Sequence, residues 1–195
     1  MTGIGSTVPV AVLAGPTVLL IARHSVRTVL RLRPIEVTAV SAVAGLMAGL
    51  VLALPPERAV VLLPLAVLGC AAAVVDVHEG RLPDVLTWPL LAVTVLAGVS
   101  TGVAATAVLS ALAGGCVAVM LKMLISAGFG WGDAKLVPTL AVVLVRHDAI
   151  VTGVVSMSVL VAVTAFIVGI GATNRSALVP YGPALVVGTV GAAAL

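Results

Sequence analysis

Charged residues are scarce in this chain of 195 amino acids, because Asp, Glu, Lys and Arg together make up only 9% of it. Soluble domains carry roughly 25% charged residues. The sequence is also 62% hydrophobic, so a water-soluble fold of this length would leave large apolar patches facing water. The shortage of charge therefore excludes an ordinary soluble domain and predicts a protein whose solvent is lipid.

Aromatic residues make up only 3% of the chain, and there are only two cysteines. The two cysteines, Cys70 and Cys116, lie inside apolar runs and form no CxxC pair, which excludes a zinc-ribbon or thioredoxin-like site. The histidines, His24, His78 and His147, are scattered, with neither metal-ligand spacing nor a serine partner. We therefore expect no metal and no cofactor, and neither metal-dependent nor serine-type hydrolysis.

Long apolar runs take up most of the chain. A membrane-crossing helix needs about 20 apolar residues, and we assign eight runs as spans: 4–22, 36–54, 59–76, 85–99, 103–126, 134–146, 149–171 and 178–195. They are too long for the strands of a membrane barrel, which leaves helices as the spanning structure. The sequence predicts an all-α integral membrane protein, a bundle of about eight transmembrane helices in a single domain over 1–195.

The distribution of Lys and Arg predicts the orientation, because cytoplasmic loops of membrane proteins are enriched in these residues. With the N-terminus outside, the outer side carries only Arg58 and Arg146, and the inner side carries Arg23, Arg27, Arg31, Arg33, Arg81, Lys122, Lys135 and Arg175. We expect a multi-pass protein of the cell membrane with both termini outside. The basic residues lie in short loops between apolar runs, so no nucleic-acid partner is expected.

Two of the seven acidic residues fall near membrane depth. Asp76 ends the apolar run that follows Arg58, after about 27 Å of helix, which nearly crosses a hydrocarbon core of about 30 Å. Asp133 lies in the segment GFGWGDAKL, only about 20 Å of helix before Arg146. The glycine-rich segment is therefore expected to dip into the membrane as a non-helical loop, packed in protein or lining a wet cavity.

Asp76 and Asp133 are separated by two predicted spans, which places both on the inner side. Carboxylates at membrane depth are costly and are functional candidates by default. Two that face one cavity would share a proton, because close like charges do not both ionise easily. One can then act as a base that activates water while the other protonates the carbonyl of a peptide bond. This pattern predicts aspartyl peptidase chemistry without a metal.

The neighbours of the two aspartates have expected structural roles. Gly130 and Gly132 should supply backbone angles closed to other residues and let the loop approach a neighbouring helix. Asp133 should then lie at a helix start, where the helix dipole favours its charged form. In DVHEGRLPDVLT, residues 76–87, Pro83 should help to break the helix, and Asp84 should be the N-cap of the next span.

Three blocks of the sequence resemble the type IV prepilin peptidases, membrane aspartyl proteases of the GxGD kind. DVHEGRLPDVLT (76–87) resembles their first-aspartate block, GFGWGDAKL (128–136) their Gly-x-Gly-Asp-x-Lys-Leu block, and VPYGPAL (179–185) the segment that opens their final span. The resemblance implies catalytic roles for Asp76 and Asp133. Residues expected to shape the site or bind substrate are Gly130, Gly132, Lys135, Arg81, Pro83 and Asp84.

The resemblance also implies a substrate: a prepilin or pseudopilin precursor, whose short basic leader is removed ahead of an apolar helix. The chain departs from the family pattern at Asp84, where Asn is usual, and at Tyr181, where Phe is usual. Only 23–35 joins the first two predicted spans, without cysteine, so the insert that carries N-methyltransferase activity in bifunctional members is not expected. Two alternatives are a membrane transporter or proton relay using the same two aspartates, and an inactive assembly subunit.

Overall fold

The computed structural model of the chain describes residues 20, 34–79, 82–124, 130–171 and 181–195. Within this part of the chain the secondary structure is entirely helical, which confirms the predicted all-α class. The elements are α2 (Pro34–Leu52), α3 (Pro56–Pro64), the π-helix η1 (Leu65–Gly69), α4 (Cys70–Glu79), α5 (Asp84–Ser100), α6 (Ala104–Leu124), α7 (Trp131–Arg146), α8 (Ile150–Gly171) and α9 (Gly182–Ala194). Since α3, η1 and α4 are continuous, these elements make seven helices.

Three helices are long and apolar enough to cross a membrane by length and composition: Pro56–Glu79, Ala104–Leu124 and Ile150–Ile167. Shorter apolar helices cover Val40–Leu52, Asp84–Ser100 and Gly182–Ala194. The chain is therefore a helical protein of membrane character, but the described residues do not bear out eight spans. Apart from Leu20, the predicted span 4–22 and the arginines of 23–33 lie outside the described residues.

The helix that ends near Asp76 contains a π-helical turn. Pro64 lacks a backbone N–H and its ring crowds the carbonyl four residues earlier, so an α-helix cannot pass through it without adjustment. The wider turn at Leu65–Gly69 follows the proline directly, and α4 then continues in regular α-helical geometry. A π-turn of this kind keeps the helix going while it absorbs the disturbance.

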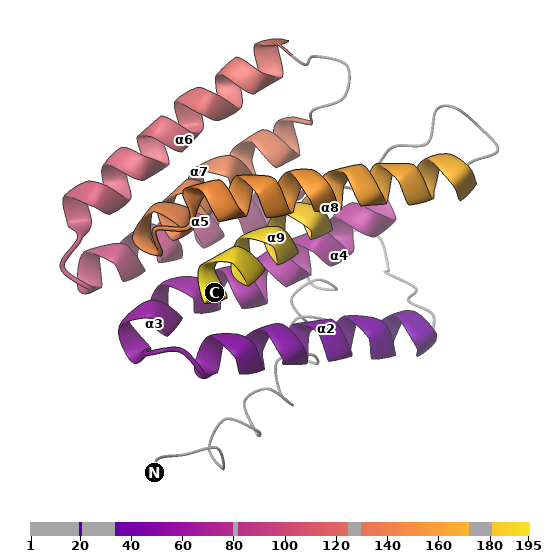
Figure 1. Cartoon of the computed structure of the whole chain (residues 1–195), viewed down its shortest axis with the longest axis horizontal. Helices are drawn as coiled ribbons and strands as arrows, with labels where there is room; N and C mark the ends of the chain where they lie inside the picture. Colours follow the sequence, from indigo (N-terminus) through magenta and orange to yellow (C-terminus); the bar gives the residue numbers. More distant parts are fainter. Residues whose placement is uncertain (1–19, 21–33, 80–81, 125–129, 172–180) are drawn as a thin grey trace.

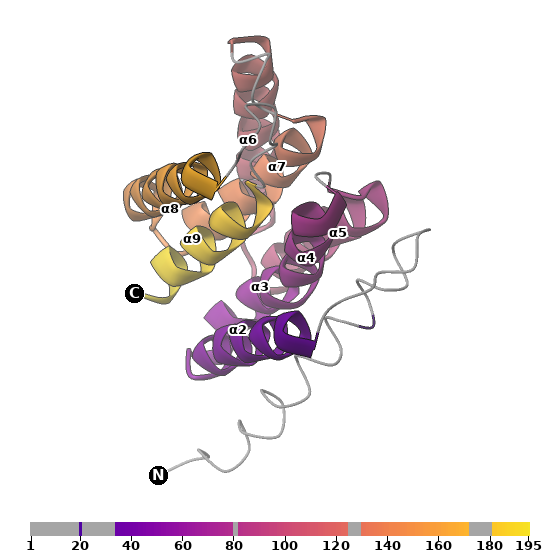
Figure 2. The same ribbon diagram turned by 90° about the vertical axis from the view of Figure 1, so that its right-hand side faces the viewer.

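The helices run roughly side by side along the long axis of the molecule (Figure 1). Seen along that axis, α6 and α7 form one pair, α8 and α9 a second, and α2 to α5 make up the rest of the bundle (Figure 2). The core between them is built from aliphatic side chains that are fully buried, including Val51, Leu62, Leu65, Val75, Leu90, Leu136, Val143 and Val186.

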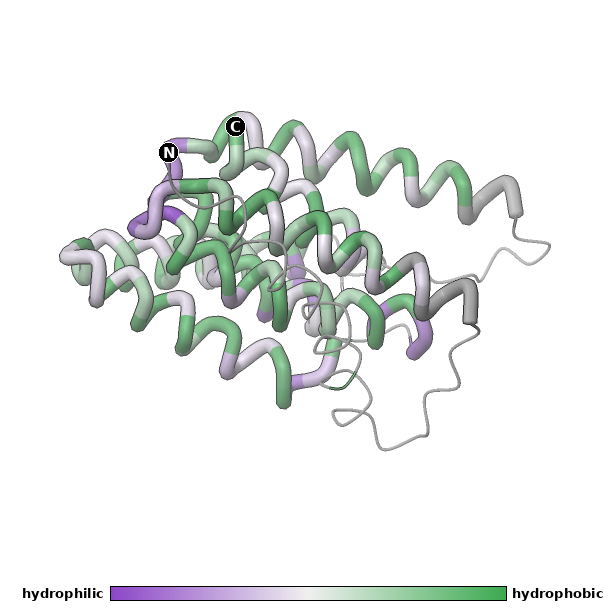
Figure 3. The backbone as a smooth tube through the Cα atoms, turned by 90° about the horizontal axis from the view of Figure 1, so that it is seen from below, coloured by the Kyte–Doolittle hydropathy of each residue, from purple (hydrophilic) through white to green (hydrophobic). Residues whose placement is uncertain are grey.

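Large apolar side chains also cover the outside of the bundle. Hydrophobic residues follow most of the helical tube (Figure 3), and few of those in α8 are buried, since only 6% of its apolar window is buried inside the bundle. Exposed residues such as Leu109, Val151 and Phe166 would face water in a soluble protein. This surface is what a lipid environment requires, since bundle helices there have no polar solvent to meet.

Candidate active site

Asp76 lies in the last turn of α4 and is 5% exposed. Its Oδ2 accepts a hydrogen bond of 2.9 Å from the backbone N–H of Gly182, a residue 106 positions further along the chain. Gly182 is the first residue of α9, and the first N–H groups of a helix have no partner within it. The start of α9 therefore supplies both a donor and the positive end of a helix dipole to this carboxylate.

A side chain would not fit at position 182. A Cβ at this position would lie 2.8 Å from Oδ2 of Asp76 and 3.2 Å from its Cβ. The close approach of the α9 backbone to the carboxylate thus depends on glycine. Gly182 was not among the site residues predicted above; its position between Tyr181 and Pro183 in the third block was the available signal.

Asp133 is the third residue of α7 and is 8% exposed. Its Oδ2 accepts a hydrogen bond of 3.3 Å from the backbone N–H of Gly130, the N-cap residue. Its Oδ1 is buried and has no hydrogen-bond partner among the described residues. The prediction that Asp133 stands at a helix start is confirmed, and one of its oxygens remains available to a further donor.

The two aspartates lie at the same end of the bundle. The C-terminal end of α4 and the N-terminal ends of α7 and α9 lie at the same end of the bundle (Figure 1), and Asp76 is close enough to Asp133 for their charges to interact. Lys122, near the end of α6, also acts electrostatically on Asp133. Two buried carboxylates with a cation nearby can divide the roles of proton donor and proton acceptor between them.

Gly132 holds the two aspartate blocks together by close packing. A Cβ there would lie 2.9 Å from the Cβ of Leu82 and 3.0 Å from its backbone nitrogen. Leu82 is buried and lies in the short connection between α4 and α5. The first turn of α7 is therefore pressed against the backbone of the segment that follows Asp76, which fixes how Asp133 is presented to it.

The predicted reason for the glycines was partly wrong. Gly132 is helical, and Gly130 has an ordinary extended conformation with φ −74° and ψ 153°. Neither adopts a positive φ; among the described glycines that conformation belongs to Gly102. Trp131 and Gly132 belong to α7 rather than to a non-helical loop, and residues 128 and 129 lie outside the described residues. The expected close approach is observed, so glycine is required for space rather than for backbone freedom.

Asp84 does not cap α5 as predicted. The N-cap residue is Pro83, with φ −76° and ψ 135°, and Asp84 is the first helical residue. Proline can precede a helix without loss because the N–H it lacks would have no partner there. The Asp84 carboxylate instead forms an ion pair with Lys135 of α7. This pair is a second link between the first and second blocks, on the exposed side of the site.

Of the six residues predicted to shape the site, five are among the described residues. Arg81 lies outside the described residues. Gly130 donates to Asp133 and Gly132 precedes it, Asp84 and Lys135 pair with each other, and Pro83 is the N-cap of α5. Leu82 joins them as a contact that no sequence signal indicated. Within the described part of the chain, no group of three His, Cys, Asp or Glu residues is arranged to hold a metal ion.

The sequence profile of the type IV leader peptidase family matches residues 61–173. This range begins within α3, includes both aspartates and all of α5 to α8, and covers more than half of the chain. The chain matches no curated protein and no solved structure.

Proposed function

Because the chain belongs to the type IV leader peptidase family, we propose that it removes the basic leader peptide from prepilin-like precursors with Asp76 and Asp133 as its catalytic residues. The observation that carries the proposal is the meeting of two buried aspartates at one end of the bundle. The family is a peptidase family, and its members of aspartic type require such a pair of carboxylates.

In the proposed mechanism one carboxyl group acts as a general base and the other as a general acid. One of the two in its charged form acts as the base that takes a proton from water, and the other in its protonated form donates to the carbonyl oxygen of the scissile peptide bond. The buried Oδ1 of Asp133, which has no protein partner among the described residues, is free to take part in either step. The N–H of Gly182 holds Oδ2 of Asp76, so the other oxygen of this carboxyl group is the one that faces the substrate.

The location of the reaction is part of the same proposal. The excess of Lys and Arg on one side predicts that the aspartate end of the bundle faces the cytoplasm and that both termini lie outside. The protein would then be a multi-pass protein of the cell membrane, and its partners are the precursor and the bilayer. Without the methyltransferase insert, we expect the new N-terminus to leave the enzyme unmethylated.

The test is co-expression of the chain with a candidate precursor that carries a basic leader and an apolar helix. Leader removal is followed by the shift of the precursor on a gel and by sequencing of the new N-terminus. We expect a single cut at the junction between leader and helix. Intact precursors in the presence of well-expressed, membrane-inserted protein would contradict the proposed activity.

Asp84→Asn should retain at least about half of the cleavage rate. The Asp84 side chain is 59% exposed and that of Lys135 is 31% exposed, and exposed ion pairs contribute only about 0–1 kcal/mol. An asparagine oxygen can still accept a hydrogen bond from the lysine ammonium group. The initial rate of leader removal measures this; a loss as large as that of an Asp76 variant would place Asp84 among the catalytic groups.

A further inference from the structure

A long apolar cavity runs between α6, α7 and α8, and Tyr181, next to Gly182, lines it. Its volume is about 710 Å³, and we name it the α6–α8 groove. It exists because α8 packs mainly on α9 and touches α7 only weakly. Its walls are Ser110, Ala113, Gly114, Val117 and Leu121 of α6, Val137, Leu140, Ala141, Leu144 and Val145 of α7, Ile150, Val154, Met157, Ser158 and Val161 of α8, with Tyr181 and Leu185 at α9.

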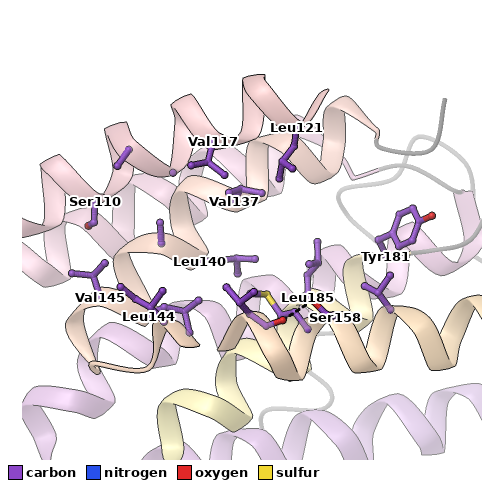
Figure 4. A pocket seen from close by; sticks show the side chains of 17 residues that line it. Ser110, Val117, Leu121, Val137, Leu140, Leu144, Val145, Ser158, Tyr181 and Leu185 are labelled. Carbon is purple, nitrogen blue, oxygen red and sulfur yellow. Dashed lines mark hydrogen bonds between the residues drawn. The ribbon is translucent and has the colours of Figure 1, made fainter. Parts of the chain in front are cut away.

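The groove is lined by residues that neighbour the candidate active site on α7 and at the start of α9. Val137 and Leu140 follow Asp133 by four and seven residues on α7, and these spacings put all three on one face of the helix. Tyr181, at one end of the groove (Figure 4), immediately precedes the Gly182 that donates to Asp76. These neighbours place the groove next to the two carboxylates, within reach of a chain that is held there.

The lining of the groove suits an apolar helix. The hydroxyls of Ser110 and Ser158 already donate to backbone carbonyls within their own helices, at 3.0 and 2.7 Å, so they demand no polar partner from an occupant. From Ser110 to Leu121 on α6, and from Ile150 to Val161 on α8, the walls extend for about 17 Å, or three helical turns. Figure 4 shows labelled side chains of the lining, among them Val117, Val137 and Leu140, in the space between the helices.

We infer that the α6–α8 groove seats the first three turns of the apolar helix that follows the cleaved bond of the precursor. The inference rests on the proposed function, because the precursor is the polymer whose charged leader and apolar helix meet at the cut. The Asp84–Lys135 pair beside the site is charged and exposed, whereas the groove is lined almost entirely by apolar side chains. This polarity matches that of the precursor on the two sides of its scissile bond.

Matched pairs of valines test the groove. Val117 lines it and Val119 does not, although each is 44% exposed; on α8, Val154 lines it at 51% exposure and Val155 does not at 56%. Val117→Trp and Val154→Trp should each lower kcat/KM for the precursor roughly tenfold or more, mainly through KM. Val119→Trp and Val155→Trp should stay near the wild-type value. Equal kcat/KM within each pair would overturn the inference.

Photo-crosslinking is a second test, which detects contact between the precursor and the groove directly and does not depend on cleavage. In an Asp76→Asn background, a benzophenone side chain replaces Val117, Val154, Val119 or Val155 in turn, and the membranes are irradiated with the precursor present. Positions 117 and 154 should capture the apolar helix of the precursor, and positions 119 and 155 should not. Equal capture at all four positions, or adducts only with lipid or with a second copy of the chain, would overturn the inference.

These outcomes separate the groove from the activity. A wild-type protein that leaves every precursor intact contradicts the proposed function itself. A wild-type protein that cleaves through its aspartates, while the groove variants behave like their matched controls, contradicts the groove alone.

Discussion

Asp76→Asn and Asp133→Asn are each expected to reduce leader removal by at least about 100-fold while the protein stays folded in the membrane. General acid–base catalysis contributes about 10²–10⁴-fold, and neither amide can exchange the proton that the reaction needs. The change is nearly isosteric, so the hydrogen bonds from Gly182 and Gly130 retain an acceptor oxygen. The measurement is the initial rate of cleavage at matched amounts of membrane-inserted protein.

Asp148→Asn is the matched control for these variants, because it makes the same chemical change at an exposed aspartate away from the site. Asp148 lies beyond the end of α7 opposite to Asp133. Its φ is 53°, a conformation that asparagine also tolerates. The cleavage rate of Asp148→Asn should be close to that of the wild-type protein. The double variant at Asp76 and Asp133 should be little worse than either single variant, because residues that act as a unit are not additive. A single variant that keeps more than a few per cent of the rate would remove that residue from the mechanism.

Gly132→Val should lower the cleavage rate on the order of 100-fold, and Gly132→Ala should fall between valine and wild type. The added Cβ would come within 3.0 Å of the Leu82 backbone nitrogen, so backbone rather than a flexible side chain must move. The displaced first turn of α7 carries Asp133, and shifts of about 1 Å at a catalytic group can cost about 100-fold in rate. Membrane insertion should be little affected, because it depends on the apolar helices.

Gly191→Ala provides the control for the glycine series. A Cβ at Gly191, in α9, would meet no atom within 4 Å, and alanine favours helix over glycine by about 1 kcal/mol. This variant should cleave at the wild-type rate. Near-normal turnover by Gly132→Val would show that the contact with Leu82 relaxes without moving Asp133, and would refute the account of Gly132 given above.

Much of the fold follows from the sequence because lipid restricts the choice so strongly. Long apolar runs in a chain with 9% charge have to be helices, since backbone groups in a bilayer must be satisfied within the segment. The described helices accordingly lie close to the predicted runs, as α6 (Ala104–Leu124) does to 103–126. The two aspartates also stood out for a physical reason, because charges at membrane depth are rarely kept without a function.

The arrangement around the aspartates depended on the tertiary structure. Spacing along the chain could not show that Gly182 donates to Asp76 across 106 residues, or that Lys135 pairs with Asp84. Nor could it show that Gly132 is required for space, because the need for a missing side chain is set by what a different segment, here Leu82, places beside it. Local sequence determines which segments become helices in lipid, whereas contacts between distant helices decide which side chains meet.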